Sequence, residues 1–235
     1  MREREEAIRE GGKAIRGRRV VCRRGGSDMR EGKVPIFRQI NIFALLFTFK
    51  SRFPHLNPYW EKYTALQQRV EYPAKTVLLQ EGKIAQNYYF IEKGCLRMWF
   101  DNNEKDTTFQ FFFENEGVSS LESFQKNIPS TFTIETIEPS VIQILPKAVF
   151  NAMLKELDQN PDFLKALMDI SFERQRHYMY EFLSRIRDTP IQRYINLIKD
   201  RPHIVQRVPQ HYIASYLGVT SVHLSRIKNQ LARKK

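Results

Sequence analysis

The spacing of apolar positions along the chain changes twice. From residue 35 to about residue 71, apolar residues recur every three or four positions, as at Trp60, Tyr63 and Leu66, which predicts helix. From residue 72 to residue 145 they fall in short alternating runs, and from residue 146 the helical spacing returns. The pattern therefore predicts a β-rich region between two helical regions.

The alternating region contains six short runs that read as strands. Turn residues such as Glu81-Gly82 and Lys93-Gly94 separate them, at intervals of about 8 to 15 residues. Strands this short and this regularly spaced are typical of an antiparallel β-roll or jelly roll rather than of a parallel sheet. The runs are residues 76–79, 88–91, 95–100, 107–113, 131–137 and 141–145.

Three helices are predicted directly after the strands. The first covers residues 147–157, the second opens at the cap and proline Asn160-Pro161 and continues to about Arg187, and the third opens at Thr189-Pro190. The second is longer than a typical globular helix, and its apolar residues cover more than one face. We expect it to pack on the roll with one side and on a second copy of the chain with another, which predicts a homodimer.

Residues 210–229, QHYIASYLGVTSVHLSRIKN, fit a DNA-binding helix-turn-helix. Ala214 is small where two helices would cross, Gly218 permits the positive φ of a tight turn, and Thr220 can cap the second helix. Apolar residues at the remaining inward positions would close a small core between the helices. These are Ile213, Leu217, Val219, Leu224 and Ile227.

The outward face of the second helix supplies the candidate DNA contacts. Arg226 is the candidate for direct base reading, since arginine pairs bidentately with guanine in the major groove. Lys228, Gln210 and Arg207 are candidates for phosphate contact, and His223 fits base contact and plain surface exposure equally well. The full set of DNA-binding candidates is Gln210, Thr220, Ser221, Val222, His223, Ser225, Arg226 and Lys228.

The net charge of +12 is unevenly distributed. Residues 185–235 carry eleven basic and two acidic side chains, whereas the segment from 36 to 184 is slightly acidic. A basic end next to a near-neutral body indicates that one part meets a polyanion. Residues 1–34 are also basic, show no apolar period, and are expected to form a disordered tail or to reflect a start placed too far upstream.

The order of roll, long helix and helix-turn-helix resembles the Crp/Fnr family of bacterial transcription regulators. The segments 207–220 and 224–227 look particularly like members from Bacteroidetes, as does Thr189-Pro190 followed by Arg193 and Tyr194. The resemblance implies an α+β chain with four parts. They are a tail (1–34), a helical lead-in with a cyclic-nucleotide-binding-like roll (35–145), connecting and dimerisation helices (146–187) and a DNA-binding domain (188–235).

The resemblance also implies partners. A homodimer would bind a near-palindromic operator in double-stranded DNA with half-sites about one turn apart, RNA polymerase is a further partner, and the roll offers a place for a small-molecule effector. The Arg-Glu pair that reads bases in the best-known members is Ser221-Val222 here, and only Arg226 coincides. The operator sequence that those members bind is therefore not expected for this chain.

The ligand segment also departs from the family. In members that bind cyclic AMP, a Gly-Glu pair holds the ribose and an Arg-Ser pair holds the phosphate; this chain has Ser119-Ser120 and Ser130-Thr131 there. Loss of the guanidinium argues against cyclic AMP. Five polar side chains remain as ligand candidates, namely Ser119, Ser120, Glu122, Ser130 and Thr131. Arg174, Arg176 and His177 on the long helix fit the roll, a dimer contact or solvent equally well.

Composition excludes several other classes. Two cysteines without a Cys-His cluster argue against a zinc or iron–sulfur site and fit a reducing cytoplasm, and the longest apolar run, residues 40–49, is too short to span a membrane. None of the five histidines lies in a predicted strand, which argues against a cupin-like enzyme and its metal. We expect no catalytic residue and no cofactor. A cyclic-nucleotide-responsive regulator and an interaction module without DNA binding stay as alternatives.

Overall fold

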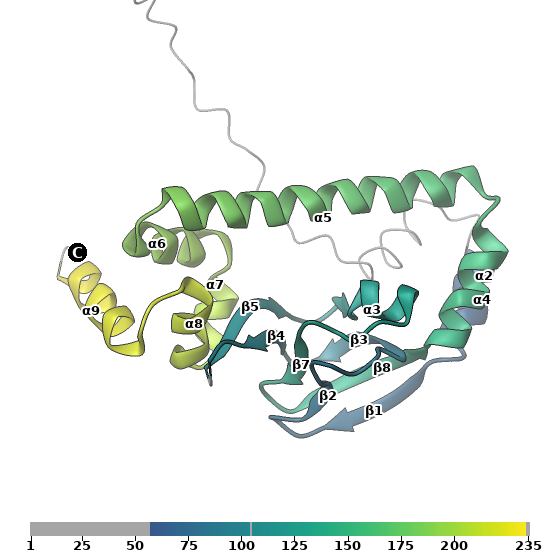
Figure 1. The fold of residues 1–235 in the computed structure, drawn as a ribbon, viewed down its shortest axis with the longest axis horizontal. Coiled ribbons are helices and arrows are strands. Elements are labelled where there is room, and N and C mark those ends of the chain that lie inside the picture. The colour runs from purple at the N-terminus through teal and green to yellow at the C-terminus, as the bar shows by residue number, and fades with distance from the viewer. Residues whose placement is uncertain (1–56, 104, 234–235) are drawn as a thin grey trace, which may run out of the picture. The chain divides into compact units, whose positions relative to one another are not determined.

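Residues 57–103 and 105–233 are described by the computed structural model, and they belong to one compact unit. The expected tail and the apolar run at residues 40–49 lie outside these residues. The described part contains two four-stranded antiparallel sheets followed by helices (Figure 1). The antiparallel roll predicted from the alternating pattern is therefore present.

The two sheets are built from strands far apart in the chain. One has the order β1-β8-β3-β6 and the other the order β2-β7-β4-β5. The strands are β1 (Gln68–Tyr72), β2 (Val77–Leu79), β3 (Asn87–Lys93), β4 (Leu96–Asp101), β5 (Asp106–Phe112), β6 (Gly117–Val118), β7 (Thr133–Thr136) and β8 (Ser140–Pro146).

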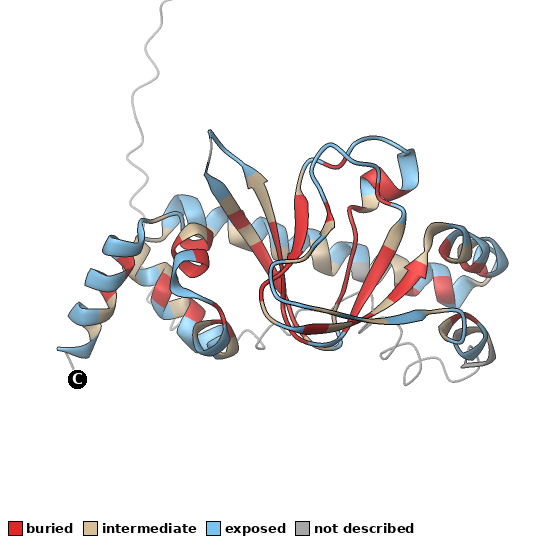
Figure 2. Ribbon diagram, turned by 90° about the horizontal axis from the view of Figure 1, so that it is seen from below, coloured by how far each residue is buried: buried red, intermediate tan, exposed pale blue. Residues whose placement is uncertain are grey.

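Buried apolar side chains between the sheets form the main core. Tyr88, Phe90, Leu96 and Phe124 are each 1% exposed or less, and helices α3 (Leu121–Lys126) and α4 (Lys147–Leu157) add residues to the same cluster. The alternation that marks the strands in the sequence thus reflects burial of one side of each sheet. The buried residues concentrate in the strands, whereas much of the long helix α5 (Pro161–Arg187) is exposed (Figure 2).

The helices follow the predicted order. They are α2 (Asn57–Thr64), α3 (Leu121–Lys126), α4 (Lys147–Leu157), α5 (Pro161–Arg187), α6 (Pro190–Asp200), α7 (Pro202–Arg207), α8 (Gln210–Leu217) and α9 (Ser221–Ala232). Asn160 caps α5 by accepting a hydrogen bond from the N–H of Phe163, and Thr189 caps α6 by accepting from Gln192. Both caps lie where the Asn-Pro and Thr-Pro pairs predict them.

One prediction about the lead-in region is wrong. Residues 68–71 were expected to continue the helix, but they belong to β1, which pairs with β8 at the edge of its sheet. Only Val70 and Tyr72 of this strand contribute to the core, so its alternation is weak. Because Leu66 follows Tyr63 at helical spacing, the pattern extends past the true end of α2 at Thr64.

Candidate nucleic-acid interface

Helices α8 and α9 are joined by a tight turn whose backbone depends on specific residues. Gly218 adopts φ +67°, the left-handed region that glycine enters freely, and its N–H bonds the carbonyls of Ala214 and Ser215. The hydroxyl of Thr220 then accepts a hydrogen bond from the N–H of His223 at 3.1 Å, which caps α9. Glycine and threonine therefore fix the angle at which α9 leaves α8.

A small core holds the two helices together. Ala214 is 1% exposed, and its small side chain lets the helices approach closely. Leu217, Leu224 and Ile227 are buried around it, and Val219 packs against the same cluster. All of these positions were predicted from the sequence to face inward, and the structure buries them except for Val219, which is half-buried.

The candidate DNA-binding residues lie on the outside. Ser221, Val222, His223, Ser225 and Arg226 are all exposed, and Val222 is 63% exposed although it is apolar. Thr220 and Gln210 are exposed as well, and Lys228 is half-buried. The structure therefore gathers seven of the eight candidates on or beside α9, from its cap Thr220 to Lys228, while Gln210 lies at the start of α8.

The exposed side of α9 is longer than the sequence analysis indicated. Asn229, Gln230 and Arg233 join Arg226 around a shallow hollow of about 420 Å³. The helix contains no acidic residue, so no carboxylate on α9 opposes its cations. Apolar periodicity locates the inward face of such a helix well, but it cannot say how far the polar side is used for binding.

Arg207, a candidate for phosphate contact in the sequence, forms two ion pairs with the roll in the structure. Its Nη2 lies 2.7 Å from Oε1 of Glu114, and it also pairs with Glu138 in the turn between β7 and β8. Burial works to raise the pKa of Glu114, but Arg207 and the N–H of Gly94 outweigh it and lower that pKa to about 2. Arg207 thus joins α7 to the roll.

Helix α8 packs directly on β5. The hydroxyl of Ser215 accepts a hydrogen bond from the N–H of Thr108 at 2.9 Å and donates to the carbonyl of Asp106 at 3.0 Å. Phe111 and Phe113 of the roll share one apolar cluster with the C-terminal helices. The sheet that carries β5 therefore holds one side of the α8–α9 pair, and α9 projects from the other.

Arg97 on β4 lies at the centre of this contact and was missed by the sequence analysis. It is 3% exposed, and its Nη2 lies 2.7 Å from both Glu135 and Asp106. Its guanidinium carbon lies 3.9 Å from the ring centre of Tyr212 on α8. The sequence offered one signal for this residue, an arginine inside an otherwise apolar strand. The spacing of apolar residues cannot identify the side chains that an arginine contacts.

The five ligand candidates from the sequence are placed less uniformly. Ser119, Ser120 and Ser130 are buried, whereas Glu122 and Thr131 are exposed. The hydroxyls of Ser119 and Ser130 donate to the carbonyls of Asn87 and Phe132, and Glu122 pairs with Lys126 one turn along α3. Three of these side chains therefore already have partners within the protein.

Metal-binding groups and membrane-spanning helices are both absent from the described residues. Within 57–103 and 105–233, no group of three or more histidine, cysteine or acidic side chains is arranged to hold a metal ion. Among those residues, no helix combines the length and apolar character needed to cross a bilayer.

Comparison with protein families matches residues 69–157 to the cyclic nucleotide-binding domain. This segment begins in β1 and ends with α4, so it covers both sheets of the roll. A search of curated protein sequences finds no match.

Solved structures show the same fold over a larger part of the chain. The c-di-GMP-responsive global regulator CLP of Xanthomonas campestris superposes with a TM-score of 0.62 at 15% identity, covering 76% of this chain and 92% of CLP. FixK2 of Bradyrhizobium japonicum gives 0.58 at 15% identity, with 72% and 85% covered, and a CooA mutant from Carboxydothermus hydrogenoformans gives 0.56 at 14%, with 73% and 78%. Residues 69–157 thus match the cyclic nucleotide-binding domain, and the chain shares its fold with these proteins.

Proposed function

We propose that this protein is a homodimeric, sequence-specific DNA-binding transcription regulator of the Crp/Fnr type, with a helix-turn-helix of the kind found in Bacteroidetes members. The single observation that carries the proposal is the pair α8 and α9, with Gly218 in the left-handed region, Thr220 as a cap and an exposed, acid-free recognition helix. The roll and the fold shared with CLP and FixK2 support the same assignment.

Arg226 and the first turn of α9 read the bases in this proposal. Side chains at the N-terminal end of a recognition helix reach base edges in the major groove, and Ser221, Val222 and His223 occupy that turn. Arg226 lies one turn further along and is exposed. Lys228 and Gln210 contact phosphates beside the groove, where they set the register on the duplex without reading sequence.

The dimer forms along α5. This helix of 27 residues exposes a stripe of apolar side chains at spacings of three, four and seven. The stripe consists of Leu164, Met168, Phe172, Met179, Leu183 and Ile186, which are between 43% and 68% exposed. A contiguous apolar stripe this long is unusual on a monomer, and a second copy of the same helix would cover it.

The roll acts as the sensor domain and the protein catalyses no reaction. An effector in the roll would shift the population of α5 and helix-turn-helix arrangements and so change DNA affinity. The protein works in the cytoplasm, where it meets DNA and RNA polymerase.

A cyclic-nucleotide-responsive regulator is the second candidate, because residues 69–157 match the cyclic nucleotide-binding domain. Residues 117–131 contain no arginine, and their one cation, Lys126, is exposed and paired with Glu122. A buried cyclic phosphate would lack a charge-assisted donor in this segment. Calorimetry with cyclic AMP and cyclic GMP separates the two candidates, since micromolar binding favours the second.

Selection of genomic fragments by the purified full-length protein tests the proposed function. We expect enrichment of one near-palindromic motif, and no enrichment over random fragments would contradict sequence-specific binding. A variant with Arg226→Ala should enrich a motif that is relaxed at one position in each half-site. Lys155→Ala, which removes an exposed cation on α4, is the matched control and should leave the motif unchanged.

A further inference from the structure

The exposed side of α5 carries a heptad pattern. Six residues recur at spacings of 4, 3, 4, 3 and 4, which is the alternation of the a and d positions of a coiled coil. Five of the six are apolar and between 52% and 68% exposed, so the described part of the chain leaves this row of side chains uncovered. We call the row the seam, and it consists of Met168, Phe172, Gln175, Met179, Phe182 and Ile186.

Gln175 is the polar residue of the seam. Its side chain is exposed, as are those of the five apolar residues. A second copy that covers the seam therefore buries an amide group together with the apolar side chains. A buried amide that lacks a hydrogen-bond partner is unfavourable, so the place of Gln175 restricts how the two copies can pair.

The apolar residues of the seam do not determine the orientation of the two helices. Their spacings read the same in both directions along α5. An antiparallel pair would place Met168 opposite Ile186 and Phe172 opposite Phe182, whereas a parallel pair would place each residue opposite its own copy. Both arrangements bury the same apolar side chains.

Gln175 distinguishes the two arrangements because it lies off the centre of the seam. In the antiparallel pair it would face Met179, whose thioether is only a weak acceptor. In the parallel pair it would face Gln175 of the second copy, and each amide offers the other a donor and an acceptor. A parallel pair shifted by one heptad would place Gln175 opposite Phe182 or Met168, and its amide would again lack a partner.

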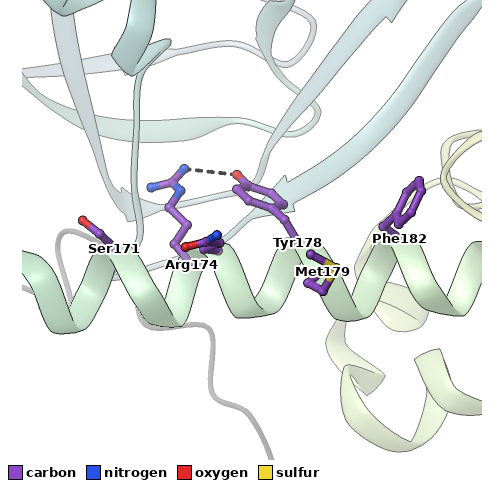
Figure 3. A pocket seen from close by; sticks show the side chains of 6 residues that line it. Ser171, Arg174, Tyr178, Met179 and Phe182 are labelled. Atoms are coloured by element: carbon purple, nitrogen blue, oxygen red, sulfur yellow. Dashed lines mark hydrogen bonds between the residues drawn. The ribbon is translucent and has the colours of Figure 1, made fainter.

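A hollow of about 500 Å³ on α5 lies where a parallel pair needs one. In a coiled coil each seam side chain packs into a hole formed by four residues of the facing helix. For Met179 of the second copy in a parallel pair, these four are Gln175, Tyr178, Met179 and Phe182, and all four line the hollow. Figure 3 shows Arg174 and Tyr178 directed from the helix toward the strands, so they border the seam on the side of the roll.

We propose that Gln175 fixes the orientation and the register of the dimer by pairing its side-chain amide with that of Gln175 in the second copy. The two α5 helices then run parallel, and both α9 helices lie at the same end of the dimer, as two half-sites about one turn apart require. The inference rests on the proposed function for the dimer itself and adds the residue that selects its geometry. A polar residue at one core position of a coiled coil has this effect, at a cost in affinity between the copies.

Disulfide formation between cysteines placed in the seam tests the orientation. Met168→Cys and Ile186→Cys are each made in the full chain with Cys22→Ser, and Cys95 is kept because it is buried. In a parallel pair each variant forms a linked dimer by itself on mild oxidation, because identical positions meet. In an antiparallel pair neither variant does, and only a mixture of the two becomes linked. We expect the parallel result, and the antiparallel result overturns the proposal.

Substitution of Gln175 tests its role in the selection. Gln175→Leu should tighten the dimer roughly tenfold or more in sedimentation experiments, because the buried amides are replaced by apolar groups. It should also permit links between residues 168 and 186 in the mixture of cysteine variants. Gln175→Asn keeps an amide and should show parallel links alone. Gln206→Leu, at an exposed glutamine on α7, is the matched control and should change neither readout.

The outcomes separate failure of this inference from failure of the proposed function. A Gln175→Leu dimer that is no tighter than the wild type, or that stays strictly parallel, overturns the role of Gln175 and leaves the dimer. A wild-type protein that sediments as a monomer removes the dimer of the proposed function and the inference with it. Fluorescence anisotropy with labelled genomic fragments measures DNA binding separately, so parallel links that depend on Gln175, without DNA binding, leave the inference and remove the regulator.

Discussion

The guanidinium of Arg97 on β4 lies 3.9 Å from the ring centre of Tyr212 on α8. Glu135 and Asp106 hold the same guanidinium from the roll, with ion-pair distances of 2.7 Å. One buried arginine therefore links the sheet to α8. The roll positions α8 and α9, the helices proposed to bind DNA, through a specific contact as well as through apolar packing.

A double-mutant cycle measures this link. We expect Arg97→Met to lower the free energy of unfolding by about 3 kcal/mol, because Glu135 is left buried without its partner. Tyr212→Leu keeps apolar volume and removes the aromatic face, and the two changes should be coupled by about 1 to 2 kcal/mol. Urea unfolding of the four proteins provides the values. If the changes in the free energy of unfolding of the two single variants add exactly in the double variant, the ring and the guanidinium do not interact.

The pair of Glu114 and Arg207 predicts a pH dependence of stability. The pKa of Glu114 is lowered to about 2 in the folded protein, so its proton binds more readily in the unfolded chain. The stabilisation that ionised Glu114 gives to the folded protein is therefore complete above the pKa of the unfolded chain, about 4.3. It is lost as the pH falls from there toward 2.

Urea unfolding at a series of pH values checks this dependence. Glu114→Gln should be less stable than the wild type at pH 7, and the difference should shrink between pH 5 and pH 2 as the wild type loses its pair. Glu122→Gln, which removes the exposed pair with Lys126, is the control and should show a much smaller change. A difference for Glu114→Gln that stays constant over this range would contradict the role of the pair.

The apolar stripe on α5 predicts which substitution should dissociate the proposed dimer. Phe172 is 61% exposed in the chain, and Phe172→Glu would place two like charges at the proposed contact between copies. We expect analytical ultracentrifugation to show mostly monomer for this variant and mostly dimer for the wild type. Lys155→Glu on α4 introduces the same side chain away from the stripe and should leave the dimer intact. A dimer that persists in Phe172→Glu would place the contact elsewhere.

Lys228 and Arg226 should differ in the kind of DNA affinity that they contribute. Lys228→Ala should weaken binding to all sequences alike and reduce the slope of log affinity against log salt by about 1, because one phosphate contact is lost. Arg226→Ala should cost roughly 1 to 3 kcal/mol at the preferred sequence and less elsewhere. Anisotropy titrations with specific and random duplexes at several salt concentrations measure both. Identical profiles for the two variants would contradict the assignment of Arg226 to base reading.

Local patterns predicted most of the fold because its elements carry local signals. The caps Asn160, Thr189 and Thr220 and the turn glycine Gly218 act within a few residues of their own position, and the structure places each in that role. The edge strand β1 was missed because only Val70 and Tyr72 of it face the core. The short helix α7 was missed because six residues give no period.

The candidate sites depend on contacts that local patterns do not contain. The sequence predicts Ser119 and Ser130 as ligand residues, but their hydroxyls donate to the carbonyls of Asn87 on β3 and of Phe132. Arg97 and Tyr212 belong to separate elements that only tertiary folding brings together. The sequence left the position of Arg174 open between the roll, a dimer contact and solvent. In the structure it lies beside the buried hydroxyl of Tyr88 on β3.

Competition binding tests the central claim most directly. A labelled duplex carrying the motif selected from genomic fragments is bound by the wild-type protein and challenged with random duplex at two salt concentrations. We predict that the motif is preferred by at least about a thousandfold, that affinity for both duplexes falls steeply with salt, and that Arg226→Ala narrows the preference. Equal affinity for motif and random duplex, or affinity that does not change with salt, would contradict a sequence-specific regulator.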